Sequence, residues 1–87
     1  MKQDNHVILA VHITDRVKKA PHVQEILSQF GCHIKVRLGL HEASPDFCSP
    51  NGLILLEMLD EPKIVKALEA KLGKIPGIET KKMVFRH

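Results

Sequence analysis

The sequence contains no Trp, no Tyr and only three Phe among its 87 residues. Its core must therefore be aliphatic, and a hydrophobic share of 44% is typical of a globular chain rather than a disordered one. So few aromatic rings also offer little surface on which the bases of single-stranded nucleic acid could stack. Recognition of single strands by stacking is therefore not expected.

Long apolar runs and polybasic blocks are missing as well. The longest apolar run, Leu53 to Leu56, is far shorter than the roughly 20 residues that cross a bilayer, so no membrane partner is expected. The net charge is only +3, and the basic residues are spread along the chain. Direct nucleic-acid binding is therefore not expected. The presence of only two cysteines, and a polar N-terminus unlike a secretory signal, predict a reducing, cytoplasmic compartment.

Four segments have the pattern of strands. Alternation of apolar and polar residues, or a short apolar run bounded by turn residues, predicts a strand. These signals predict strands over residues 6–13, 32–41, 53–59 and 78–86. The second strand has one polar face, and its apolar residues are expected to share the other face: Ile34, Val36, Leu38 and Leu40.

Two helices are expected between these strands. Apolar residues at helical spacing over residues 17–30 predict the first helix. Because Pro21 lacks a backbone donor, the regular helix is expected to start near Ala20. The second helix is expected to be capped by Asp60 and to end at Gly73. The segment between the second and third strands is expected to be a loop.

The resulting order, βαββαβ, predicts one α+β domain over residues 1–87. Right-handed crossovers fold this order into a ferredoxin-like sandwich, with a four-stranded antiparallel sheet in the order 4-1-3-2 and both helices on one face. The other face then carries Ile8, Ala10 and alternate residues of segment 53–59. An exposed apolar face on so small a chain predicts an oligomer interface. A chain of this size buries only about 60–65% of its unfolded surface, which makes a lone core marginal.

Short motifs spread over nearly the whole chain carry a resemblance. They are Thr14-Asp15-Arg16, Val23-Gln24-Glu25-Ile26-Leu27, Arg37-Leu38-Gly39-Leu40-His41, Cys48-Ser49-Pro50-Asn51-Gly52-Leu53 and Gly73-Lys74-Ile75-Pro76-Gly77-Ile78. They resemble a family of small ACT-like proteins identified as regulators of the iron-only hydrogenase system, and the chain is also similar to the C-terminal, metal-binding domain of the nickel-responsive repressor. The resemblance implies a regulatory domain that is not an enzyme, forms dimers or tetramers, senses a small molecule and acts with a protein of the hydrogenase system.

The same resemblance implies an effector site at the turn after the first strand, where Asp15 and Arg16 are the polar residues. Arg16 could hold a carboxylate through a bidentate pair of hydrogen bonds. The plainer interpretation is that Asp15 caps the first helix and that Arg16 is solvated. No glycine is present in this turn, although ligand-binding ACT domains usually have one there.

A transition metal is the alternative ligand, because imidazole and thiolate suit nickel, zinc or copper. His41 and Cys48 flank the expected loop and could converge, but the chain has no Cys-x-x-Cys, His-x-His or His-x-x-x-His spacing. No cofactor is therefore predicted, and a metal-responsive sensor needs ligands from a partner subunit. A further alternative is an adaptor that has no ligand and binds a larger protein. No nucleophile with both a base and an orienting group is evident, so no catalysis is expected.

Overall fold

The computed structural model describes residues 5–14, 16–40, 43–44, 47–48 and 52–86. Its elements, in chain order, are β1 (His6–Ile13), α1 (Arg16–Gln29), the short 3-10 helix η1 (Gly31–His33), β2 (Ile34–Leu40), β3 (Ala43–Ser44), β4 (Phe47–Cys48), β5 (Gly52–Met58), α2 (Pro62–Gly73) and β6 (Ile78–Phe85). Within the described ranges, no helix is long and apolar enough to cross a membrane.

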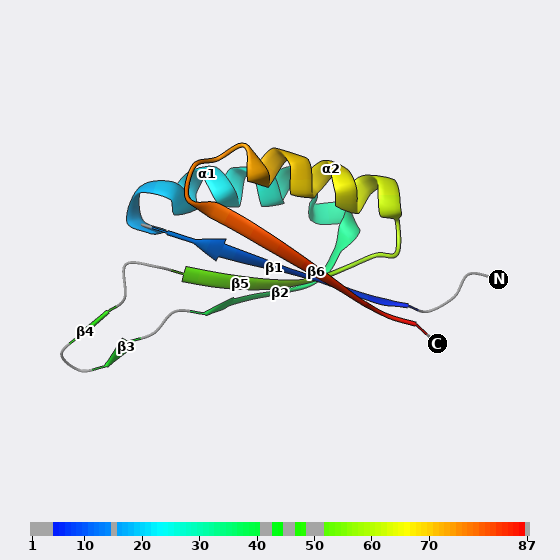
Figure 1. Ribbon diagram of the computed structural model, residues 1–87, viewed down its shortest axis with the longest axis horizontal. Coiled ribbons are helices and arrows are strands. Elements are labelled where there is room, and N and C mark those ends of the chain that lie inside the picture. The colour runs from blue at the N-terminus through cyan, green and yellow to red at the C-terminus, as the bar shows by residue number, and fades with distance from the viewer. Residues whose placement is uncertain (1–4, 15, 41–42, 45–46, 49–51, 87) are drawn as a thin grey trace.

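The main sheet is antiparallel and has the order β2-β5-β1-β6. Both helices lie on one side of it, and the other side is open (Figure 1). The predicted α+β, ferredoxin-like sandwich and its strand order are therefore confirmed. The segment expected to be a plain loop instead contains two short antiparallel strands, β3 and β4, with Ala43 opposite Cys48.

The core lies between the sheet and the helices and is aliphatic, as expected. Alternate residues of β1 and β5 point into it, and each helix adds one apolar stripe. The buried side chains are Val7, Leu9, Val11, Ile13, Val23, Ile26, Leu27, Ile54, Leu56, Met58, Val65, Leu68, Leu72 and Ile75. Burial of each larger aliphatic side chain contributes about 1.5–3 kcal/mol, so this layer dominates the stability of the fold.

Both helix starts differ from the sequence-based expectation. The first helix begins at Arg16 and continues through Pro21, which is exposed. A proline in the second turn removes one backbone hydrogen bond, and packing of Val23, Ile26 and Leu27 outweighs that loss. In the second helix Glu61, not Asp60, occupies the N-cap position, and it makes no side-chain cap bond.

Strand β2 also differs, because its pairing with β5 shifts register. Ile34 lies opposite Met58 and Val36 lies opposite Glu57, so two steps on β2 match one step on β5. This β-bulge places Ile34 against the core, while Val36 and Leu38 lie on the open side and are exposed. The expectation that all four apolar residues of this strand share one face is therefore wrong.

Candidate functional site

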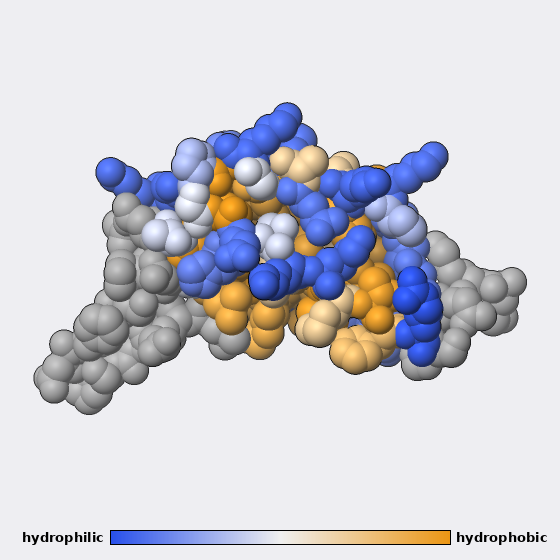
Figure 2. Space-filling model, in the orientation of Figure 1, coloured by the Kyte–Doolittle hydropathy of each residue, from blue (hydrophilic) through white to orange (hydrophobic). Residues whose placement is uncertain are grey.

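The side of the sheet that faces away from the helices is the candidate site, and we call it the open face. Its side chains come from all four strands, because directly paired residues of antiparallel strands point to the same side. The apolar members with described side chains are Ile8 and Ala10 (β1), Val36 and Leu38 (β2), Leu53 and Leu55 (β5), and Met83 and Phe85 (β6). Figure 2 shows hydrophobic side chains along the lower edge, beneath the strands, and hydrophilic ones over the helices.

Pairing joins these residues into continuous rows. Ile8 lies opposite Met83 on one side and opposite Glu57 on the other, and Val36 lies opposite Glu57. Among the described residues, four of the five exposed large hydrophobic side chains belong to the open face, each 51–57% exposed: Val36, Leu38, Met83 and Phe85. Such clustering indicates an interaction surface, whereas scattered exposed apolar residues need no explanation.

The sequence predicted only part of this surface. Ile8 and Ala10 lie on the open face, as expected from the alternation in β1. Val36 and Leu38 were missed because the β-bulge in β2 re-aims them. Met83 and Phe85 could have been found, because they alternate with Lys82 and Val84 along β6, where Val84 packs against the core.

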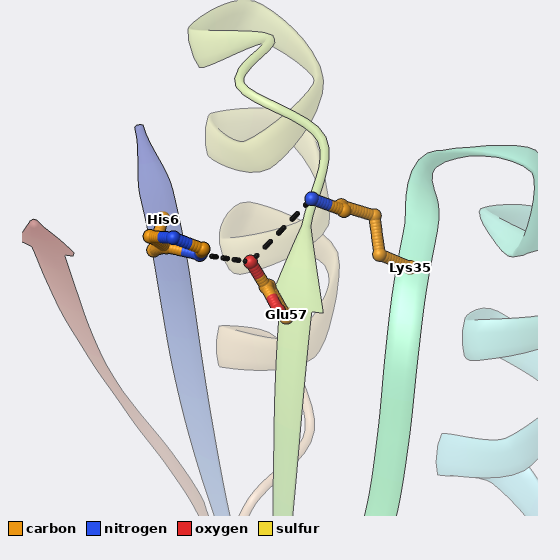
Figure 3. A network of polar contacts seen from close by, with 3 residues as sticks. All are labelled: His6, Lys35 and Glu57. Atoms are coloured by element: carbon orange, nitrogen blue, oxygen red, sulfur yellow. Dashed lines mark hydrogen bonds and ion pairs between the residues drawn. The ribbon is translucent and has the colours of Figure 1, made fainter. Parts of the chain in front are cut away.

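A polar network interrupts the open face at one end. Nδ1 of His6 lies 2.6 Å from Oε2 of Glu57, and Nζ of Lys35 lies 3.6 Å from the same oxygen (Figure 3). An ionised carboxylate only accepts hydrogen bonds, so Nδ1 of His6 donates. The hydrogen bond from His6 lowers the pKa of Glu57 below its ordinary value, and Lys35 adds to this effect while desolvation opposes it.

Two further polar contacts lie where the strands of this end meet α2. Nδ2 of Asn5 donates to Oδ2 of Asp60 at 3.0 Å, and Nδ1 of His33 lies 2.8 Å from Oε1 of Glu61. The backbone N–H of Leu59 also donates to the carbonyl of His33. These contacts hold η1 and β1 against the start of α2. In the described ranges no group of three or more His, Cys, Asp or Glu side chains is placed to hold a metal ion.

The expected metal ligands lie outside the part of the chain that can be tested. His41 is not among the described residues, and only the backbone of Cys48 is described, in β4. Cys32 is a free, exposed thiol in η1. The pairing of His41 with Cys48 therefore stays a prediction.

The expected effector turn follows β1. Asp15 lies outside the described residues, and only the backbone of Arg16 is described, at the start of α1. The neighbouring backbone is tied to the turn before β6: Thr14 N–H donates to the carbonyl of Gly77 at 2.9 Å, and Lys19 Nζ donates to the carbonyl of Pro76.

Gly77 explains how the two turns approach so closely. Its φ of +85° is a left-handed conformation that favours glycine. A Cβ at this position would lie 2.9 Å from Lys19 Nζ. These contacts therefore hold the start of α1 against the turn between α2 and β6.

Comparison with known proteins gives similar structures. No protein-family model matches the chain, and no curated protein matches it. The uncharacterized protein TM1266 from Thermotoga maritima is 27% identical, with a TM-score of 0.76, over 93% of this chain and 98% of that chain.

More distant similarity extends to CPII, a nitrogen regulatory PII-like protein from Thiomonas intermedia K12. Its apo form is 10% identical, with a TM-score of 0.66, over 99% of this chain and 95% of that chain. Its form bound to ADP, AMP and acetate is 12% identical, with a TM-score of 0.60, over 100% of this chain and 92% of that chain. At identities this low, the structural similarity shows a shared fold alone.

Proposed function

We propose that the chain is a small, non-catalytic regulatory domain that self-associates through the open face and responds to a small-molecule effector. The observation that carries the proposal is the row of exposed apolar side chains on a sheet that the helices cover on one side only. Burial of apolar surface is the main favourable term in protein association, so a second copy of the same face is a suitable partner. Ile8 and Ala10 lie within this surface and are proposed contact residues.

The regulatory part of the proposal draws on two likenesses. The chain shares its fold with a nitrogen regulatory PII-like protein. Its motifs resemble those of small ACT-like regulators of the iron-only hydrogenase system, which makes a protein of that system the proposed target. We place the effector at the turn after β1, where Asp15 and Arg16 supply the charges, and an anionic effector suits the guanidinium of Arg16.

Light scattering on purified protein tests self-association. The wild type is expected to be a dimer or tetramer at micromolar concentration. The double variant Met83→Glu with Phe85→Glu places two charges on the open face and is expected to be monomeric and folded, because both side chains are exposed. Lys66→Glu, on the exposed surface of α2, makes the same change in net charge and should keep the wild-type assembly. A monomeric wild type would refute the proposal.

A thermal-melting screen with nucleotides and small carboxylates tests the effector site. A ligand that binds only the folded state raises the melting temperature. Arg16→Ala is expected to abolish the shift for an anionic effector. An unchanged shift in this variant would remove Arg16 from the site, even if self-association stands.

A further inference from the structure

A concave surface lies on the opposite side of the molecule, between the two helices. It is a groove of about 390 Å³, with α1 on one side and the end of α2 and the following turn on the other. Its lining combines apolar and polar side chains: His22, Glu25, Ile26, Gln29, Lys71, Lys74, Ile75 and Pro76. Ile26 and Ile75 belong to the core and are 6% and 8% exposed, so they form the apolar floor of the groove.

The rim of the groove is mainly basic. Nζ of Lys71 donates to Oε1 of Gln29 at 3.0 Å and lies 5.8 Å from the ring centre of Phe30, so this ammonium group is held at the rim. Lys74 and His22 have no acidic partner within the described part of the chain. Among the described residues that line the groove, Glu25 is the only acidic one.

The surrounding helix surface has the same sign of charge. Lys18, Lys63 and Lys66 are exposed on α1 and α2. Glu69 is the only acidic residue of α2, and its Oε1 lies 3.8 Å from Nζ of Lys82. The helix layer as a whole therefore carries excess positive charge, which attracts an anionic partner toward this side of the molecule.

We infer that this groove binds an acidic segment of a partner protein, with an aliphatic side chain against Ile26 and Ile75 and carboxylates near Lys71 and Lys74. Lys71 lies in the last turn of α2 and Lys74 is its C-cap residue, so both ammonium groups are at the end of the helix that borders the groove. A nucleic acid fits less well, because the described residues that line the groove include no arginine and no aromatic ring on which a base could stack.

The groove lies on the helix side of the sheet, so packing of two open faces against each other leaves it accessible. Each copy in an assembly would then present one groove on its outer surface. The inference goes beyond the proposed self-association and does not depend on it, because a monomer has the same groove.

Fluorescence anisotropy with labelled peptides tests the inference on the full chain. The probe is a ten-residue peptide of glutamates and aspartates with two central leucines. One comparison peptide replaces the leucines with alanines, and another replaces the acids with lysines. The wild type is expected to bind the acidic leucine peptide more tightly than the alanine peptide and to leave the lysine peptide unbound. Equal binding of the leucine and alanine peptides would contradict a role for the apolar floor, and no binding of the acidic leucine peptide would overturn the inference.

Matched charge reversals at the two ends of α2 locate the site. Lys71→Glu with Lys74→Glu is expected to weaken binding by about tenfold or more. Lys63→Glu with Lys66→Glu makes the same charge change on the same helix, away from the groove lining, and is expected to cost about twofold or less. Equal losses would mean that only long-range charge attracts the peptide, and a single-stranded oligonucleotide that competes more strongly than the peptide would favour a nucleic-acid partner. Both results would overturn the inference.

A measurement on the wild type guards against misfolded variants. The backbone amide NMR signals of residues 22–29 and 71–75 are expected to shift on addition of the acidic leucine peptide, while those of the open face stay in place. Shifts confined to the open face would refute the groove and point to the sheet instead. The oligomeric state measured above is a separate result, so failure of the groove and failure of self-association can be told apart.

Discussion

The two faces of the main sheet have similar apolar content and different neighbours. On β5, Leu56 is 1% exposed beneath the helices, while the adjacent Leu55 points to the open face and is partly exposed. The same alternation occurs on β1, where Leu9 is buried and Ile8 is not. One face thus supplies the core of the single chain, and the other keeps apolar surface available for a partner.

The largest expected difference between the two faces concerns folding stability. Leu56→Ala leaves a cavity in the core and should lower the free energy of unfolding by about 2–5 kcal/mol. Leu55→Ala removes the same atoms from the open face and should cost clearly less at protein concentrations too low for assembly. Urea denaturation of both variants, at low and high protein concentration, measures the difference. Equal losses at low concentration would mean that the open face belongs to the folding core of one chain.

The next effect concerns association. Val36→Asp places a charge on the open face, and Arg37→Asp places one on the helix side of the same strand, where Arg37 lies opposite Leu56. Val36→Asp is expected to weaken self-association by about tenfold or more, because it would bury an unpaired carboxylate. Arg37→Asp should have little effect. Sedimentation velocity over a concentration series gives the self-association constant of each variant. A larger loss for Arg37→Asp than for Val36→Asp would exclude the open side of β2 from the interface.

The smallest effect concerns the polar network of His6, Lys35 and Glu57 at one end of the open face. The hydrogen bond from His6 and the charge of Lys35 lower the pKa of Glu57 in the folded state. A lowered folded-state pKa contributes stability at pH values above 4.5, the ordinary value of the group, and this contribution is lost as pH falls through the folded-state pKa. Glu57→Gln should therefore flatten the fall in stability below pH 4.5. Chemical denaturation between pH 3 and 7, with Glu25→Gln on the exposed surface of α1 as the control, tests this expectation.

Local patterns in the sequence predicted most of the fold. Alternation in residues 6–13 and helical spacing in residues 62–73 matched β1 and α2, because each pattern depends on neighbours within a few residues. The errors lie where a distant contact outweighs a local preference. The packing of α1 against the core lets the helix continue through Pro21. Asp60 is not the N-cap of α2, and its carboxylate instead accepts a hydrogen bond from Asn5, which is far away in sequence.

The candidate sites were less predictable than the fold. Ile8 and Ala10 could be placed on the open face because alternation and the number of helices suffice for that inference. Val36 and Leu38 depend on a register shift against β5, and no local pattern in β2 reports it. The helix groove joins residues of α1 to residues about 50 positions later, so it could not be foreseen from either segment alone.

By itself, the sequence determined an aliphatic core, the order of strands and helices, and two apolar faces on the central strands. Residue type and period act locally, and these properties follow from them. Only the tertiary structure decided which face the helices cover, which side chains of β2 join the open face, and which charges meet Glu57. Each of those outcomes depends on pairing between strands that are distant in the chain, and a one-residue shift in such a pairing moves a side chain from one face to the other.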